Sequence, residues 1–379
     1  MDVDNFSQEM PGHFVAIEGG LQAFVPDPLP PEIPLDFELV RLLEDAAKSL
    51  AQLNGLSQTF LKWPFLRREA LISSSMEGTV TGLTELAVYE ADFTLEEAKD
   101  VKEVWNNQKA LGEGLTSLKE TDRGITVGLI KELHHDLLSG VRGRDKNPGE
   151  FRMQQAFIVN FKAQKREEAR FVPPPAEQVP PCMEELVEYI NREDEQLPYL
   201  IKVALVHYQF ETIHPFADGN GRMGRILIPL MLSRGGWMRE PLLYLSGYFA
   251  AHDREYKDLM LGVSQTGDWL SWVKFFLRGI SVQAQDGVER ASRLHELKED
   301  YYELCGRLPT GANLMKLVDL LFWIPAITIA GARDSVEVTY PTAKSYISSL
   351  VELGIIEEYI PRDRNSIYLA KEIVEISEN

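Results

Sequence analysis

The sequence has little of what several protein classes depend on. Its 379 residues include only two cysteines, Cys182 and Cys305, too few and too far apart for a zinc cluster or a disulfide framework. Cations are in deficit, since 39 Lys and Arg against 58 Asp and Glu give a net charge of −19. A surface this acidic repels nucleic acids and anionic membranes. The most apolar long stretch, residues 317–332, contains Asp319 and Pro325 and is too short to span a bilayer.

The chain also begins without a basic segment of the kind that opens a signal peptide, because its first residues are Met1-Asp2-Val3-Asp4. What is present is an ordinary globular composition, with 44% apolar and 26% charged residues. We therefore expect a cytoplasmic protein without a membrane partner, built from one large core and a smaller satellite domain.

Apolar residues recur at three- and four-residue steps along most of the chain, which predicts a mainly α fold. A proline-rich stretch at residues 26–34 predicts an extended segment over the surface. Pro229 should bend or end its helix. The predicted helices cover residues 37–53, 65–76, 83–89, 95–109, 127–138, 183–191, 200–212, 222–232, 268–279 and 282–305.

One stretch departs from the helical period. Residues 151–172 contain two short runs of β-forming residues, 156–159 and 171–172, around a polar segment at 162–168. This pattern predicts a β-hairpin with a long charged tip. Three prolines, residues 173–175, should end it, since proline cannot continue a strand ladder.

The last stretch, residues 306–379, predicts a winged helix-turn-helix domain. It reads as a helix at 314–323, a second short element, a helix at 340–353, and strands at 355–356 and 367–369. Seven cations against ten anions give this segment a net charge of −3, and Lys344 is the one cation of its recognition helix. DNA binding needs several cations that neutralise phosphates. We therefore expect protein contact or dimerisation here, and no DNA binding.

One segment carries the chemistry, and it joins two predicted helices at residues 213–225. Gly219, Asn220 and Gly221 tolerate left-handed backbone angles, so their N–H groups can form an anion-binding nest. The nest opens onto a helix N-terminus, where backbone dipoles favour negative charge. Arg222 and Arg225 share one side of that helix. Together these groups predict a cradle for a polyphosphate.

Two further side chains complete this site. Asp218 offers a hard oxygen ligand for Mg²⁺ bridging phosphates. His214 can accept a proton near neutral pH. The combination indicates a nucleotide phosphate site with a built-in base, where a hydroxyl attacks a bound phosphate. Gly219, Gly221 and Gly224 also match G-x-G-x-x-G, but no strand precedes them as a dinucleotide fold requires.

The string from His214 to Arg225, HPFADGNGRMGR, resembles the signature H-x-F-x-[DE]-G-N-G-R-x-x-R of Fic domains, with every defined position filled. Flanking similarities extend the resemblance to residues 129–277, and they include Pro148-Gly149-Glu150-Phe151-Arg152 and Leu245-Ser246-Gly247-Tyr248. The chain departs from many members at His252-Asp253, where they carry Asn-Arg.

The resemblance implies a Fic-type helical bundle and protein AMPylation, the transfer of AMP from ATP to a Ser, Thr or Tyr hydroxyl with release of pyrophosphate. It implies that His214 is the base, that Asp218 binds Mg²⁺ and that Tyr248 lies near the adenine. The hairpin at 151–172 would dock the target by strand addition. The ATP-binding residues implied by position are Gly219, Asn220, Gly221, Arg222, Met223, Gly224, Arg225 and Tyr248.

A second motif, Ser73-Ser74-Ser75-Met76-Glu77-Gly78, resembles the inhibitory motif [ST]-x-x-x-E-[GN] of the same family. Ser73 and Glu77 are four residues apart and would share one helix face, with Gly78 ending the helix. Glu77 could pair with Arg225, which the γ-phosphate needs. We therefore expect autoinhibition by a helix at about residues 65–77 of the same chain.

The predicted organisation is an N-terminal helical region at 1–110, a catalytic core at 111–285, a linking helix at 286–305 and a winged helix at 306–379. The leading hypothesis is a Mg²⁺-dependent protein adenylyltransferase, which also modifies itself. One alternative is a winged-helix regulator whose Fic-like region senses nucleotide, and another is a Fic enzyme that mainly removes AMP. Some family members move phosphocholine, phosphate or UMP, but the intact Arg225 favours a nucleoside triphosphate donor. The oligomeric state stays open.

Overall fold

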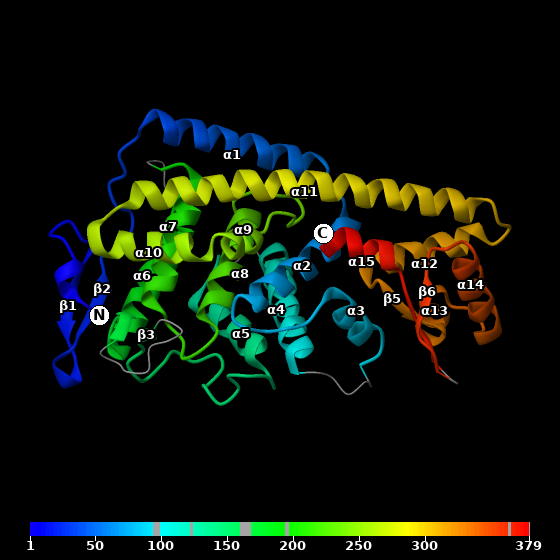
Figure 1. Cartoon of the computed structure of the whole chain (residues 1–379), viewed down its shortest axis with the longest axis horizontal. Helices are drawn as coiled ribbons and strands as arrows, with labels where there is room; N and C mark the ends of the chain where they lie inside the picture. Colours follow the sequence, from blue (N-terminus) through cyan, green and yellow to red (C-terminus); the bar gives the residue numbers. More distant parts are fainter. Residues whose placement is uncertain (94–98, 122–123, 160–167, 194–196, 363–364, 379) are drawn as a thin grey trace.

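The structure is a computed structural model, and it describes residues 1–93, 99–121, 124–159, 168–193, 197–362 and 365–378. It confirms a mainly α fold with three small sheets in the described residues (Figure 1). In the first half of the chain the elements are β1 (Gly12–Ala16), β2 (Gln22–Pro26), α1 (Phe37–Gly55), α2 (Lys62–Ser75), α3 (Leu83–Ala91), α4 (Lys99–Thr121), α5 (Val127–Leu138), β3 (Ile158–Val159), β4 (Ala169–Phe171) and α6 (Val179–Asn191).

The second half of the chain completes the bundle and adds a C-terminal group of short elements. The elements are α7 (Tyr199–Ile213), α8 (Asn220–Arg234), α9 (Ser246–Ala251), α10 (Asp253–Thr266), α11 (Trp269–Gly306), α12 (Gly311–Trp323), β5 (Ala326–Thr328), α13 (Ile329–Val336), α14 (Tyr340–Glu352), β6 (Glu357–Ile360), β7 (Ile367–Leu369) and α15 (Lys371–Glu378).

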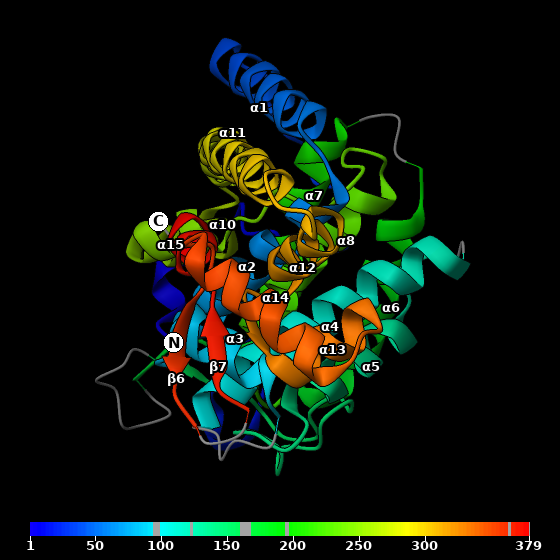
Figure 2. The same cartoon turned by 90° about the vertical axis from the view of Figure 1, so that its right-hand side faces the viewer.

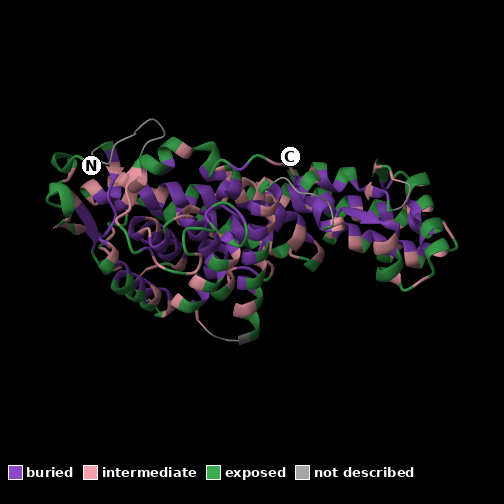
Figure 3. Ribbon diagram, turned by 90° about the horizontal axis from the view of Figure 1, so that it is seen from below, coloured by how far each residue is buried: buried purple, intermediate pink, exposed green. Residues whose placement is uncertain are grey.

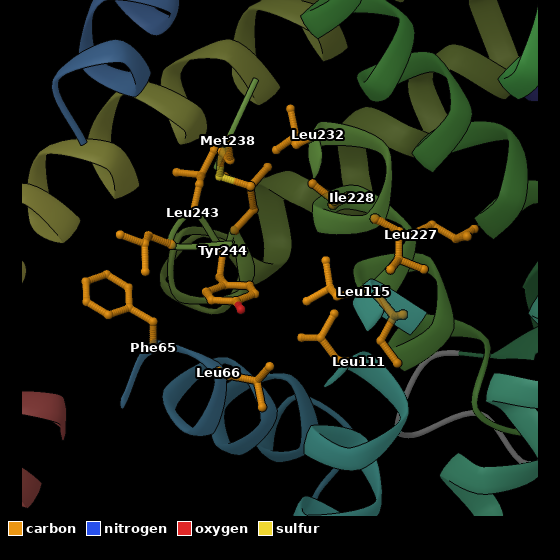
Figure 4. Close-up of a cluster of buried hydrophobic side chains, with 14 of the residues drawn as sticks. Phe65, Leu66, Leu111, Leu115, Leu227, Ile228, Leu232, Met238, Leu243 and Tyr244 are labelled. Atoms are coloured by element: carbon orange, nitrogen blue, oxygen red, sulfur yellow. The ribbon is translucent and has the colours of Figure 1, made fainter. Parts of the chain in front are cut away.

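Two helices, α7 and α8, form the centre of the bundle. Both are apolar on nearly every side, and nearly all of their residues are buried, as expected of central helices. Pro229 does not end α8, which continues to Arg234. Part of the surrounding core lies between α2, α4 and α8 (Figure 4); the residues labelled there are Phe65, Leu66, Leu111, Leu115, Leu227, Ile228, Leu232, Met238, Leu243 and Tyr244.

The opening of the chain contains a hairpin that the sequence analysis did not predict. Residues 12–26 form the antiparallel hairpin of β1 and β2. The hairpin packs against the end of β4, because the Phe24 N–H donates to the Val172 carbonyl at 2.9 Å and the Phe24 and Phe171 rings lie 5.7 Å apart. The apolar runs Phe14-Val15 and Ala23-Phe24-Val25 were too short to stand out beside the prolines that follow.

The long helix α11 joins the two ends of the molecule. The sequence analysis divided it into two helices near Gly279, but the structure has one continuous helix of 38 residues. Gly279 lies inside this helix, where the ring of Tyr248 packs against it. A Cβ at this position would lie 2.7 Å from that ring, so the contact needs a residue without a side chain. Figure 1 shows α1 alongside the first half of α11, and α12 to α15 near its second half.

The C-terminal segment has the order helix, strand, helix, helix, strand, strand and a final helix. Its sheet has the order β5-β7-β6, with both pairs antiparallel. The strand predicted at 355–356 begins two residues later, at Glu357. Ile355 and Ile356 are buried but precede the strand. The interpretation of this segment as a winged helix stays a prediction, as do the domain boundaries.

This segment packs directly against α2 and α3 (Figure 2). Arg67 of α2 is 3% exposed; it pairs with Glu90 at 2.7 Å and donates to the Trp323 carbonyl. Trp63 lies against Trp323, with ring centroids 4.5 Å apart. Buried residues therefore continue through the interior from the bundle into the C-terminal end (Figure 3). Within the described residues, the search for a helix long and apolar enough to cross a membrane finds none.

Candidate functional site

The residues of the signature occupy the connection between α7 and α8. His214 follows the last residue of α7 in a left-handed conformation, with φ 51° and ψ 60°, which is a strained conformation for a residue with a side chain. Its carbonyl accepts a hydrogen bond from Nε of the buried Arg152 at 2.8 Å. Arg152 also donates to the carbonyls of Pro174 and Gln154. Arg152 therefore fixes the turn that presents His214.

The environment of His214 favours its neutral form. Burial, together with the charge of Arg152, lowers the pKa of His214 to about 4, because both disfavour a second positive charge. The carbonyl of Glu211 and the carboxylates of Glu77 and Asp218 oppose this effect without reversing it. At neutral pH the imidazole is therefore available as a proton acceptor.

The loop after His214 is closed by Asn220 and by a second histidine. The Asn220 side chain accepts from the Phe216 N–H and donates to the Phe216 carbonyl, both at 2.8 Å. His134 stacks on the Phe216 ring with centroids 3.7 Å apart, and its Nε2 lies 2.9 Å from the Asp218 carbonyl oxygen. Both polar groups of the Asn220 side chain are therefore engaged inside the loop. The prediction that Asn220 contacts ATP stays a prediction, with its backbone N–H and the second Nδ2 hydrogen still able to donate.

The N-terminus of α8 has the features of an anion site. Gly219 precedes the helix with φ 79°, and no side chain caps its first turn, so backbone N–H groups of that turn lack intrahelical partners. Asp218 Oδ1 accepts from the Gly219 N–H at 2.6 Å. Met223 directs its side chain into the core, and its predicted contact with ATP stays a prediction. Gly224 packs against Glu211, where a Cβ would lie 2.2 Å from a carboxylate oxygen.

Arg222 is the most buried cation of the site, with an exposed fraction of 0%. Its Nη2 lies 3.5 Å from Asp218 and its Nη1 lies 4.0 Å from Glu103 of α4. Its Nε and Nη1 make no hydrogen bond with any described residue. A buried guanidinium with unsatisfied donors is costly unless a ligand completes it. Arg222 is therefore prepared for an anionic ligand.

Arg225 is already occupied by the segment that carries the second motif. Its Nε donates to the Ser73 hydroxyl at 2.9 Å, and its Nη2 donates to the Ser73 carbonyl and to Oε1 of Glu77, each at 2.8 Å. Burial raises the pKa of Glu77, but the charge and hydrogen bond of Arg225 outweigh it and hold that pKa below its usual range. The expected pairing of these residues is therefore present.

Glu77 reaches Arg225 from a turn and not from the helix face that the sequence predicted. The helix α2 ends at Ser75, and Gly78 follows with φ 89°. The N–H of Glu77 donates to the Ser74 carbonyl at 3.0 Å, which places the carboxylate just beyond the helix end. Ser73, still inside the helix, contacts the same guanidinium.

A cleft of about 330 Å³ opens beside His214, within the size range of small-molecule sites. It is lined from the predicted site by Glu77, His214, Gly221 and Arg225. Tyr248 does not line it; that side chain packs against Phe275 and His252 in a separate groove. The other residues that line the cleft are Met76, Ile158, Val159, Arg170, Phe171, Glu211, Thr212, Asp253, Tyr256, Lys257, Met260, Leu261 and Ser264.

Glu211 and Tyr256 are cleft residues that the sequence analysis missed. Burial raises the pKa of Glu211 to about 7 despite the nearby charge of Arg225, and Oε1 of Glu211 has no hydrogen-bond partner among the described residues. The Tyr256 hydroxyl lies 2.8 Å from Nε2 of His207. Glu211 lies on α7, three residues before His214, and this spacing was the available signal.

Asp218 fits the requirements of a magnesium ligand. Its Oδ1 is engaged by the loop, while no described residue hydrogen-bonds to Oδ2. No group of three or more acidic, histidine or cysteine side chains gathers among the described residues. A single carboxylate suits Mg²⁺, which keeps several waters and takes further ligands from substrate phosphates.

The predicted hairpin is present as β3 and β4, which pair antiparallel beside the cleft. Its expected charged tip lies outside the described residues, apart from Glu168. β4 also contacts the N-terminal hairpin through Val172 and Phe24. The outer edge of this small sheet is therefore the edge of β3.

Comparison with known proteins agrees with this geometry. The profile of the Fic/DOC family matches residues 124–232, and that of the Fic/DOC family N-terminal region matches residues 40–116. The chain therefore carries a Fic/DOC domain and, before it, the N-terminal region of the same family. Its Fic domain thus contains α5 to α8 with the connection from His214 to Gly219, and the N-terminal family region contains α2 with Glu77.

Curated relatives match part of the chain. The chain is 29% identical over 136 residues to the protein adenylyltransferase Fic of Nematostella vectensis, covering 36% of this chain and 29% of that protein. It is 36% identical over 83 residues to a probable protein adenylyltransferase of Aquifex aeolicus, covering 22% and 26%. The chain therefore matches less than a third of the length of either relative.

Solved structures show the same fold at low identity. A Fic family protein from Desulfovibrio desulfuricans G20 covers 90% of this chain and 98% of its own, with a TM-score of 0.57 and 18% identity. Fic-1 from Caenorhabditis elegans covers 68% of this chain and 73% of its own, with a TM-score of 0.52 and 22% identity. The likeness to the first protein extends over the C-terminal segment as well as the Fic domain.

Proposed function

We propose that this chain is a protein adenylyltransferase, which moves AMP from ATP to a Ser, Thr or Tyr hydroxyl of a target protein and of itself. The observation that carries the proposal is that a neutral His214 and the Arg225 guanidinium line one cleft beside the N-terminus of α8. The names of the curated relatives support the same activity. We place the activity in the cytoplasm, where the free thiols of Cys182 and Cys305 would stay reduced.

In this proposal the triphosphate binds along the first turn of α8. The unpaired backbone N–H groups of that turn and the unsatisfied donors of Arg222 hold phosphate oxygens. Arg225 holds the terminal phosphate once Glu77 has left it. His214 accepts the proton of the target hydroxyl while the hydroxyl oxygen bonds to the α-phosphorus. The bond between the α-phosphorus and the oxygen that bridges to the β-phosphorus breaks, and pyrophosphate leaves.

Asp218 would hold Mg²⁺ through its free Oδ2 together with phosphate oxygens. The ion, when bound, would neutralise the charge that develops on the phosphates. Asp218 itself keeps the loop in place through the Gly219 N–H. This division leaves one carboxylate oxygen for the loop and one for the metal.

The resting state of the enzyme is inhibited in this account. The Glu77 carboxylate occupies the guanidinium that the γ-phosphate needs, and its negative charge repels that phosphate. ATP bound beside an occupied Arg225 would lie in a pose unfit for in-line attack. Removal of Glu77 from Arg225 is therefore the activating step.

The target would dock at the edge of β3 beside the cleft. Val159 on that strand is 45% exposed, and the opposite side of the sheet is engaged by the N-terminal hairpin. An extended target segment can add to such an edge through backbone hydrogen bonds. The acidic C-terminal segment would serve protein contact or dimerisation and not DNA binding.

Removal of AMP is a second candidate activity of the same site. The Glu77 carboxylate lines the cleft together with His214, so it stands where a carboxylate could orient a water molecule. Transfer would attach AMP to the target and removal would release it. Nucleotide sensing, the other alternative, would bind ATP without either reaction.

The test uses ATP labelled at either the α- or the γ-phosphate, with Mg²⁺ and a cell lysate as the source of targets. Adenylyl transfer predicts protein-bound label from α-labelled ATP alone. Label from the γ-position would indicate phosphate transfer instead. Bound ATP without label in any protein would favour the sensor, and loss of AMP from a premodified target would favour removal.

A further inference from the structure

The segment that carries Glu77 is held at a second place, away from Arg225. The Glu77 carbonyl accepts a hydrogen bond from Nη2 of Arg142 at 2.9 Å. The Thr79 hydroxyl donates to Oε2 of Glu103 at 2.9 Å, and the Val80 N–H donates to Asp100 at 2.9 Å. Residues 77–80 are thus fastened to α4 and to the loop after α5 by contacts that leave the Glu77 carboxylate free for Arg225.

Glu103 is the centre of this second attachment. Its Oε2 is shared by Thr79, by Arg142 at 3.3 Å and by Arg222 at 4.0 Å. Thr79 is 5% exposed and Glu103 3% exposed, so water does not replace these contacts readily. A single carboxylate oxygen therefore joins the inhibitory segment to the arginine that is prepared for phosphate.

Arg142 is the accessible member of the group. Its side chain is 50% exposed, while those of Glu103 and Arg222 are 4% and 0% exposed. One nitrogen, Nη2, donates both to the Glu77 carbonyl and to Glu103. Arg142 therefore closes the attachment from the solvent side, and its loss would release the Glu77 main chain without touching Arg225.

We propose that Arg142, Glu103 and Thr79 are positioning residues that hold residues 77–80 in the inhibitory place, and that Glu103 couples this hold to Arg222. The proposal rests on the proposed transfer activity and deepens it by naming what keeps Glu77 on Arg225. Release of the inhibited state then requires two attachments to open, one at Arg225 and one at Arg142 and Glu103.

The test compares Thr79→Val and Arg142→Ala with matched controls, Thr116→Val on α4 and Arg144→Ala two residues beyond Arg142. Thr79→Val removes one hydroxyl with little change of shape, and neither substitution alters Glu103, which also serves Arg222. Hydrogen exchange of the backbone amides at residues 77–81 is the readout that does not depend on activity. We expect faster exchange in both variants and unchanged exchange in both controls. Exchange equal to that of the unaltered chain in both variants would overturn the proposal.

Adenylyl transfer gives the second readout. We expect each variant to raise the initial rate about threefold to tenfold, the range of one lost hydrogen bond, and to have no further effect when Glu77→Gly is also present. A merely structural role would lower the rate in both backgrounds and would overturn the proposal, as would an unchanged rate where Glu77→Gly itself is active. If Glu77→Gly is inactive, the proposed transfer activity fails, and the exchange experiment alone decides on the hold.

Discussion

The guanidinium of Arg225 and the carboxylate of Glu77 lie 2.8 Å apart, although 148 positions separate them in the sequence. The contact joins the end of α2 to the first turns of α8, where the phosphates would bind. The chain therefore supplies its own anion to the place that a substrate anion needs. Under the proposed function, this competition would keep the enzyme inactive at rest.

Ser73→Ala tests the contact that Ser73 makes with Arg225 beside Glu77. The substitution removes the hydroxyl that accepts from Nε of Arg225, while the Ser73 carbonyl and Glu77 still bind Nη2. We expect adenylyl transfer to rise about fivefold, as one net hydrogen bond is worth about 1 kcal/mol. The initial rate of protein labelling from α-labelled ATP measures this rise.

The control is Ser75→Ala, because the Ser75 hydroxyl contacts only the Ile72 carbonyl of its own helix. It should leave the rate unchanged. A rise of the same size in both variants would mean that the end of α2, and not the bond to Arg225, controls the rate.

The pH dependence of the released enzyme follows from the low pKa of His214. Burial and Arg152 lower this pKa to about 4, so the base is neutral above that pH and is lost as the pH falls through it. Because Glu77 is one of the groups that raise this pKa, for Glu77→Gly we expect kcat/KM to stay level from neutral pH down to about 5 and to fall only at about 4 or below. Initial rates measured from neutral pH down to about 4 test this expected pH dependence. Far-ultraviolet circular dichroism at each pH confirms that the protein stays folded. A fall centred on the ordinary histidine value near 6.5 would contradict the assignment.

Asp218→Asn separates the metal role of this residue from its role in the loop. Asparagine keeps an oxygen that can accept from the Gly219 N–H, but it removes the charge that Mg²⁺ requires. In the Glu77→Gly background we expect transfer to fall about 100-fold and the Mg²⁺ concentration for half-maximal rate to rise. Asp145→Asn, in an exposed loop, is the control. An unchanged Mg²⁺ requirement would assign the metal to another ligand.

Arg67→Ala tests the attachment of the C-terminal segment to α2. It breaks a buried ion pair with Glu90 and removes the donor to the Trp323 carbonyl. We expect the free energy of unfolding to fall by about 3–5 kcal/mol, measured by urea denaturation. The exposed Arg41→Ala on α1 should change it little. A loss below about 1 kcal/mol would show that Arg67 does not hold α2 to α3 through Glu90 and to the C-terminal segment through the Trp323 carbonyl.

The sequence predicted most helices and the connection between α7 and α8 because both depend on local pattern. Periodic apolar residues suffice for α1, α5 and α7, and the run from His214 to Arg225 contains its own helix start. The pairing of Glu77 with Arg225 was predicted because two short motifs of one family stood in one chain.

The missed features depend on tertiary contacts. Gly279 looked like a helix end, although the ring of Tyr248 packs against it inside α11. The hydrogen bonds of the Asn220 side chain to Phe216 can be seen only in the folded loop. Arg142 and Glu103 carry no local signal at all, since 39 residues separate them.

The most direct test of the central claim is incorporation of label from α-labelled ATP in three proteins: the unaltered chain, Glu77→Gly, and Glu77→Gly with His214→Ala. Exposed Glu184→Gln on α6 is the matched control for loss of a carboxylate. The account predicts little label in the unaltered chain and in the control, strong label in Glu77→Gly, and none in the double variant while it still binds ATP. Equal label with and without Glu77, or label that survives the loss of His214, would contradict it.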